Sequence, residues 1–157
     1  MAIIYMTGNL YTTQPGHYIA HSVNAQGVMG RGFAKTYREL NPDSFSQYSN
    51  YCSKNNKRSL VGTYLKTIDA KTNQLSALLV TSEGYGTRVD APSFILDATK
   101  KSVTLFLRDH CSGTKKQVIE SPRINSGLFS VPWEKTEAVL ANCLSNYPHV
   151  DWIVWGD

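Results

Sequence analysis

Two short stretches of the sequence combine glycines with amide and hydroxyl side chains in a way that suits phosphate binding. The first runs from His21 to Ala34 and carries Gly27, Gly30 and Gly32 just before a helix-like pattern. Glycines let backbone N–H groups approach a phosphate, and a helix N-terminus adds positive potential. The spacing matches neither the dinucleotide fingerprint nor the P-loop. The stretch therefore predicts an anion-binding turn, with a purely structural turn as the alternative.

The second stretch runs from Ser121 to Trp133 and also leads from a strand-like run through small residues into a helix. Its Asn125, Ser126 and Gly127 offer N–H groups and a hydroxyl. Phe129 stands at the tip, where the face of a sugar can rest, or else it fills the core. Two such turns on neighbouring strands can hold a pyrophosphate from both sides, so the pair favours a binding role more than either turn alone.

His21 is the candidate for proton transfer, because an unperturbed histidine titrates near about pH 6.5. It lies three residues before Asn24, so the two side chains point to opposite faces of a regular strand. A bulge at the strand end would bring them to one face; otherwise His21 is a buried, hydrogen-bonded histidine. Glu83 and Asp90 lie in a glycine-rich loop that can reach the site, with solvated carboxylates as the alternative.

Neither a metal centre nor a disulfide is expected. The other three histidines show no metal-ligand spacing, and no CxxC pair exists, which argues against a zinc ribbon or a redox pair. An odd number of distant cysteines fits free thiols in a reducing, cytoplasmic setting. The residues concerned are His17, His110 and His149, and Cys52, Cys111 and Cys143.

The elements that must position these residues alternate between short β-rich runs and longer helical ones. This alternation predicts a largely parallel, buried sheet whose ligands bind at the carboxyl ends of the strands, in the loops after Met6, Val23, Thr81 and Ile124. The expected strands are Ile3–Met6, Tyr18–Val23, Val61–Thr67, Leu75–Thr81, Gln117–Ile124 and Asp151–Trp155; the expected helices begin near Gly30 or Gly32, at Ser44, after a capping Asp90 with Pro92 in the first turn, and at Pro132.

Composition fits one domain over residues 1–157. Of the 157 residues, 41% are hydrophobic and 18% charged, which excludes long disorder and coiled coil. No secretory signal and no apolar run of membrane-spanning length appears. The net charge is +4, but the first thirty residues contain no Asp, Glu, Lys or Arg. The balance favours anionic partners such as phosphates and falls short of the basic stripe of a dedicated nucleic-acid binder.

The two turns resemble those of the macrodomain superfamily, whose members bind ADP-ribose. HSVNAQGVMGRGFA and PRINSGLFSVPW are most similar to the small ADP-ribose 1″-phosphate phosphatase branch, and Thr7-Gly8-Asn9-Leu10 is a weaker third match. The resemblance covers essentially the whole chain. It implies a three-layer α/β/α sandwich around a mixed, largely parallel sheet of about six strands, folded as a single macrodomain.

The resemblance also implies roles for individual residues. Asn9 stands where many macrodomains carry an aspartate that binds the adenine amino group, and an amide there brings no charge. The candidate catalytic residues are His21 and Asn24. The expected ligand contacts are Asn9, Leu10 and Trp155 at the adenine, Asn24 at the distal ribose, Gly30, Arg31, Gly32 and Phe33 in the first diphosphate loop, and Ser126, Gly127, Leu128 and Phe129 in the second, with Phe129 beside the distal ribose.

The expected activity is hydrolysis of ADP-ribose 1″-phosphate to ADP-ribose and phosphate, without cofactor or metal. A related branch uses a lysine and an aspartate, but those positions hold Ser82 and Phe129, so a lysine adduct is not expected. The alternatives are a non-catalytic ADP-ribose-binding module, a hydrolase that removes ADP-ribose from proteins or nucleic acid, and an RNA-binding module. The last is suggested by residues 1–78, which carry eight basic and three acidic side chains. A monomer with no membrane and no nucleic-acid partner is expected.

Overall fold

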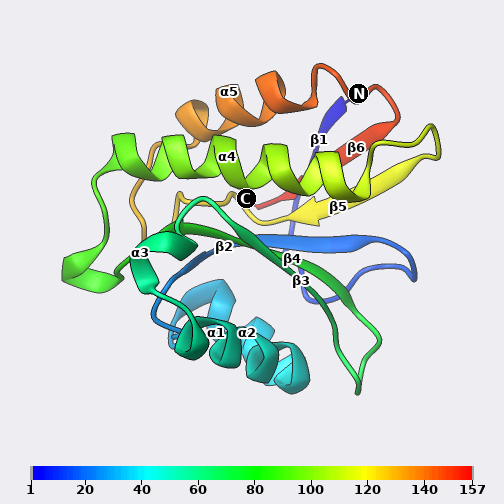
Figure 1. Cartoon of the computed structure of the whole chain (residues 1–157). Coiled ribbons are helices and arrows are strands. Elements are labelled where there is room, and N and C mark those ends of the chain that lie inside the picture. The colour runs from blue at the N-terminus through cyan, green and yellow to red at the C-terminus, as the bar shows by residue number, and fades with distance from the viewer. Residues whose placement is uncertain (1, 157) are drawn as a thin grey trace.

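A six-stranded sheet forms the centre of the molecule (Figure 1). The computed structural model describes residues 2–156. The strand order is β1-β6-β5-β2-β4-β3, and every neighbouring pair is parallel except β3 and β4. The predicted mixed, largely parallel sheet is therefore confirmed. The strands are β1 (Ala2–Met6), β2 (Tyr18–Asn24), β3 (Tyr64–Ile68), β4 (Leu75–Ser82), β5 (Gln117–Ser121) and β6 (Val150–Trp155).

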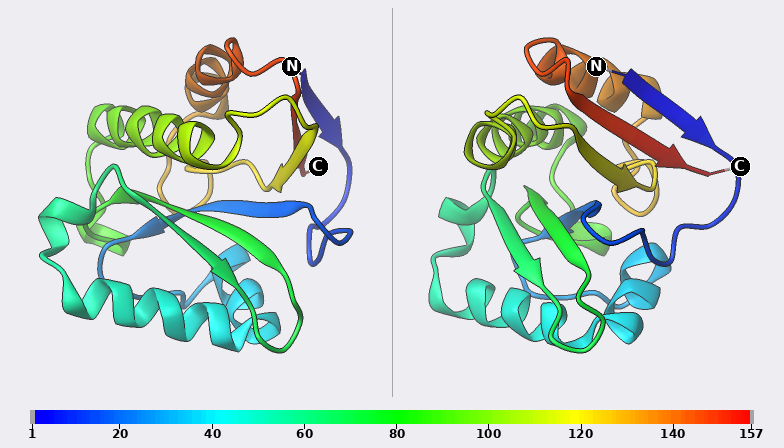
Figure 2. Two further views of the ribbon diagram at one scale, coloured as in Figure 1. Left: turned by 45° about the vertical axis from the view of Figure 1, so that its right-hand side comes forward. Right: turned by 90° about the vertical axis from the view of Figure 1, so that its right-hand side faces the viewer.

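Helices cover the sheet on both faces, which gives the three expected layers (Figures 1 and 2). One face packs against α1 and α2, and the other packs against α4 and α5. No helix between residues 2 and 156 is long and apolar enough to span a bilayer. The helices are α1 (Gly32–Leu40), α2 (Pro42–Lys54), α3 (Lys57–Leu60), α4 (Pro92–His110) and α5 (Trp133–Leu144), with a 3₁₀ turn, η1 (Gly86–Arg88).

Side chains along the central strands point alternately to the two faces of the sheet, so the core consists of two clusters. Tyr18 and Ala20 of β2 belong to the cluster beneath α4 and α5, whereas Ile19 and Val23 belong to the one beneath α1 and α2. Seven of the eight residues of β4 are buried, as expected for a strand covered on both faces. The carboxyl ends of β2, β4 and β5 are therefore held rigidly side by side.

Several details differ from the sequence-based expectations, including the start of β3 at Tyr64 rather than Val61 and the end of β5 at Ser121 rather than Ile124. Asp90 does not cap α4: the N-cap is Ala91, which makes no side-chain cap bond, and the Asp90 carboxylate instead accepts the backbone N–H of Glu83. Helix α2 begins at Pro42 rather than at Ser44, because proline is well suited to the first helical position. The short helix α3 has no counterpart in the prediction, since four residues carry too little periodicity to detect.

Candidate active site

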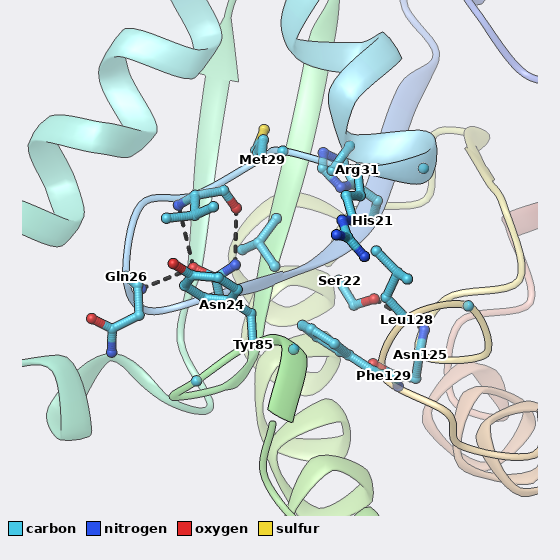
Figure 3. Close-up of a pocket in the computed structure, with 18 of the residues that line it drawn as sticks. His21, Ser22, Asn24, Gln26, Met29, Arg31, Tyr85, Asn125, Leu128 and Phe129 are labelled. Carbon is cyan, nitrogen blue, oxygen red and sulfur yellow. Dashed lines mark hydrogen bonds between the residues drawn. The ribbon is translucent and has the colours of Figure 1, made fainter. Parts of the chain in front are cut away.

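A cavity of about 1200 Å³ opens at the carboxyl ends of β2, β4 and β5 (Figure 3). Three segments form most of its wall. They are the turn after β2 (residues 24–34), the loop after β4 (residues 83–90) and the turn after β5 (residues 122–129). Figure 3 shows Asn24, Gln26 and Tyr85 on one side of the view and His21, Arg31 and Leu128 on the other. This is the edge of the sheet at which parallel α/β proteins bind ligands.

The turn after β2 is organised around the buried side chain of Asn24. Its Oδ1 accepts the backbone N–H groups of Gln26 (2.9 Å) and Val28 (3.3 Å), and its Nδ2 donates to the Val28 carbonyl (2.9 Å). The hydroxyl of Tyr48 on α2 donates to both oxygens of Asn24. A primary amide has two N–H donors. Asn24 therefore keeps one N–H for a ligand while it holds the turn.

An irregularity in β2 brings the two candidate catalytic residues to one face of the sheet. The register between β2 and β4 shifts between Val23 and Asn24. The His21 ring packs on α1 with its centroid 4.5 Å from that of the Tyr37 ring, on the same face as Ile19 and Val23. After the shift, Asn24 also faces this side and bonds to Tyr48 on the neighbouring helix α2. This shift allows His21 and Asn24, three residues apart, to face the same side of the sheet, which a regular strand would not allow.

His21 is buried and electrically neutral. Its exposed fraction is 2%, its Nε2 has no hydrogen-bond partner among residues 2–156, and its ring also contacts Phe33. Burial lowers the pKa of His21 from 6.5 to about 3. The proton-transfer role considered from the sequence assumed a pKa near 6.5, and burial places the pKa well below that value. At neutral pH the ring can donate or accept a hydrogen bond, but it carries no charge.

The first glycine turn, which is the turn after β2 (residues 24–34), ends in the N-terminus of α1 with its unpaired backbone N–H donors. Arg31 is the N-cap in extended conformation and makes no side-chain cap bond, and the first turn holds no acidic residue. Gly32 has a φ of 58°, which favours glycine at this position. The N–H groups of the first helical turn lack intrahelical acceptors. They are available to an anion beside Gly30, Arg31, Gly32 and Phe33, all of which line the cavity.

The turn after β5 is fixed by Asn125, which is 2% exposed and has a φ of 65°. Its Oδ1 accepts from the Thr81 hydroxyl (2.9 Å), and its Nδ2 donates to Thr99 (2.9 Å) and Thr136 (3.5 Å). The residues that follow, Gly127, Leu128 and Phe129, line the cavity, whereas Ser126 is not among the lining residues. Leu128 is 58% exposed.

The loop after β4 and the short helix α3 contribute cavity residues that the sequence analysis did not assign. Arg58, Tyr85 and Arg88 line the cavity together with Glu83 and Asp90. The sequence signal was the glycine-rich character of residues 83–90, which marked the loop without assigning a role to Arg88.

The residues expected at the adenine lie apart from the cavity lining. Leu10 is 6% exposed and packs in the same core cluster as Trp155, whereas Asn9 is exposed. The Trp155 indole donates to the carboxylate of Glu120 (2.9 Å), which also bonds to His17 (2.9 Å). The structure thus brings Leu10 and Trp155 together next to the end of β6, and neither belongs to the walls of the cavity.

Comparison with known proteins identifies the family. A model of the Macro domain matches residues 20–140. This chain is a macrodomain. It is similar to the ADP-ribose 1″-phosphate phosphatase of Candida albicans, with 35% identity over 150 residues that cover 88% of this chain and 91% of the relative.

Solved structures agree with this macrodomain fold. The macrodomain of Mycobacterium tuberculosis DarG superposes with a TM-score of 0.78 at 19% identity, covering 98% of this chain and 96% of that one. Thermosipho africanus DarTG, solved in complex with ADP-ribose, gives a TM-score of 0.70 at 18% identity and covers 90% of this macrodomain and 38% of that chain. At these identities the likeness shows the fold.

Proposed function

We propose that this macrodomain hydrolyses ADP-ribose 1″-phosphate to ADP-ribose and inorganic phosphate. The observation that carries the proposal is the cavity itself, which two glycine turns enclose at the ends of adjacent strands in a chain 35% identical to an enzyme of that name. The ADP-ribose seen with Thermosipho africanus DarTG supports the same class of ligand. The three cysteines are free thiols, and we propose that residues 1–157 form one macrodomain that functions in the cytoplasm.

In this proposal the diphosphate lies between the two turns. The backbone N–H groups at the start of α1 and the side chain of Arg31 hold it from one side, and the segment from Gly127 to Phe129 closes the other. The remaining N–H of Asn24 donates to the distal ribose. Recognition then depends on N–H groups and a helix N-terminus, which matches the lack of charged side chains before Arg31.

The proposed reaction adds water across the bond between the distal ribose and its phosphate, so that ADP-ribose gains a hydroxyl and inorganic phosphate leaves. A neutral His21 supplies a hydrogen bond to water or to a ribose hydroxyl, and Asn24 orients the sugar. A lysine adduct plays no part, because Ser82 occupies that position and its hydroxyl already donates to the Gly84 carbonyl (2.7 Å). Positioning of the substrate therefore supplies most of the rate enhancement.

The test is release of phosphate from ADP-ribose 1″-phosphate by the purified protein, with Gly127→Glu as the matched control. A Cβ at Gly127 meets no atom within 4 Å, so the substitution leaves the turn intact and places a carboxylate beside the diphosphate. We expect wild-type turnover and a loss of at least about tenfold in the variant, from like-charge repulsion at the site. Equal phosphate release by both proteins would contradict the proposal.

The second candidate is a non-catalytic ADP-ribose-binding module, which the neutral His21 favours because it removes the expected proton donor from the site. Calorimetry with ADP-ribose separates the two. Micromolar binding without any turnover of the phosphorylated compound supports the binding module, and turnover supports the enzyme.

A further inference from the structure

Four arginine residues line the cavity: Arg31, Arg58, Arg88 and Arg123. Arg31 is the N-cap residue of α1, and the Arg123 side chain lies beside Gly156, directly after β6. Arg88 belongs to the loop after β4, and Arg58 of α3 is paired with Glu83 of that loop. Arg31 and Arg123 therefore belong to the two turns, whereas Arg58 and Arg88 lie outside them.

The loop that carries Arg88 is folded tightly on itself. A Cβ on Gly84 would lie 2.2 Å from the Arg88 carbonyl oxygen, so only glycine fits there. The Arg88 N–H donates to the Tyr85 carbonyl (3.0 Å). At the base of the loop the Ser82 hydroxyl accepts the N–H of Asp90 (3.0 Å). The backbone at Arg88 is therefore fixed before any ligand arrives.

Arg88 is the unpaired cation of its end of the cavity. The carboxylate of Glu83 lies 3.3 Å from Arg58, and that of Asp90 accepts the Glu83 N–H. The guanidinium of Arg88 forms no ion pair or hydrogen bond with any residue from 2 to 156. Both acids near it are thus engaged elsewhere. An exposed guanidinium on a rigid loop is suited to bidentate binding of a phosphate.

The loop is bonded directly to the turn of Asn24. The Gln26 side chain donates to the Glu83 carbonyl (3.0 Å), and the Ala25 N–H donates to the Ser82 carbonyl (3.0 Å). Arg88 consequently belongs to the same end of the cavity as Asn24, which the proposed function assigns to the distal ribose.

We propose that Arg88 binds the 1″-phosphate and selects the phosphorylated ligand over ADP-ribose. This inference rests on the proposed function, since the distal ribose must lie at Asn24. It adds a specificity residue from a loop that neither glycine motif includes.

The test compares two ligands in four proteins: wild type, Arg88→Ala, Arg88→Lys and Arg108→Ala. Arg108 is an exposed residue of α4 paired with Asp109, so its loss controls for net charge. Kinetics give KM for ADP-ribose 1″-phosphate, and calorimetry gives Kd for ADP-ribose. We expect Arg88→Ala to raise KM about tenfold. Arg88→Lys should lie between it and wild type, because lysine keeps the positive charge but cannot donate two parallel hydrogen bonds as the guanidinium does.

The ADP-ribose Kd should change less than about twofold in Arg88→Ala, and Arg108→Ala should leave the ratio of the two constants unchanged. An equal effect of Arg88→Ala on both ligands, or no effect on either, would overturn the inference. If wild type shows no turnover, the proposed function fails, and direct titration with the intact phosphorylated ligand still decides the role of Arg88.

Discussion

The two turns that enclose the cavity are each built around a buried asparagine, but the two side chains are used differently. Asn24 bonds mainly within its own turn and to Tyr48, and it keeps one N–H free. Asn125 bonds to hydroxyls on β4, α4 and α5, and both of its N–H groups are occupied. The first asparagine can therefore serve structure and ligand together, whereas the second joins distant elements and has no donor left for a ligand.

The largest expected effect comes from Asn125→Ala. The change leaves the buried Thr81 hydroxyl without its acceptor, removes the donor to the Thr99 hydroxyl and puts alanine at a φ of 65°. We expect a loss of about 3 kcal/mol in the free energy of unfolding, measured by urea titration. Ser126→Ala, one residue on, is the control and should cost less than about 0.5 kcal/mol. A similar loss in both variants would contradict the assigned role of Asn125.

Lowering the pH should destabilise the protein through His21, which lies in β2 just before the first turn; the second turn has no such group. The folded state keeps this imidazole neutral down to a pKa of about 3, whereas the unfolded chain protonates it near 6.5. The unfolded state therefore binds more protons between these values, and stability falls as the pH is lowered through that window. Between pH 7 and pH 5 we expect His21 to account for a loss of about 2 kcal/mol.

Urea unfolding at both pH values, in wild type and in His21→Gln, measures this loss. The glutamine variant does not titrate, so the difference between the two proteins isolates His21 from other groups. The same pH dependence in both proteins would show that burial of His21 does not control the acid sensitivity.

The smallest expected effects come from removing the hydroxyl that donates to the Oδ1 of each asparagine, and they compare the two side chains directly. Tyr48→Phe and Thr81→Val each remove one hydroxyl that donates to an asparagine Oδ1. We expect each to cost about 1 kcal/mol of stability. Only Tyr48→Phe should weaken ADP-ribose binding, by about threefold in calorimetry, because only that turn presents its asparagine to the ligand. Weaker binding in Thr81→Val as well would mean that both turns respond alike.

The sequence predicted the features that depend on local patterns. The alternation of strands and helices was readable because each run carries its own periodicity, and both turns were found because their glycines precede helical patterns. Gly30 to Phe33 and Gly127 to Phe129 line the cavity as expected from the motifs. The strand and helix bounds differ by a few residues, mainly where a proline or a short turn sets the end.

What could not be predicted depends on contacts between distant segments. The neutral state of His21 results from burial beneath Tyr37, and its alignment with Asn24 results from the register shift against β4. The position of Arg88 depends on the fit of Gly84 against its carbonyl. The carboxylate of Asp90 accepts the Glu83 N–H instead of capping α4. Capping preferences of residue types could not predict this, because the partner lies in another part of the loop.

The strand order also has a consequence for synthesis. Within residues 2–156, β1 pairs with β6 alone, so of these six strands the one made earliest depends on the one made latest for its hydrogen bonds. Until Val150–Trp155 has been made, the backbone of Ala2–Met6 has no partner in the sheet, and Ile4, Tyr5 and Met6 stay partly exposed even in the folded protein. β1 therefore joins last, when the inner strands that build the cavity can already have assembled.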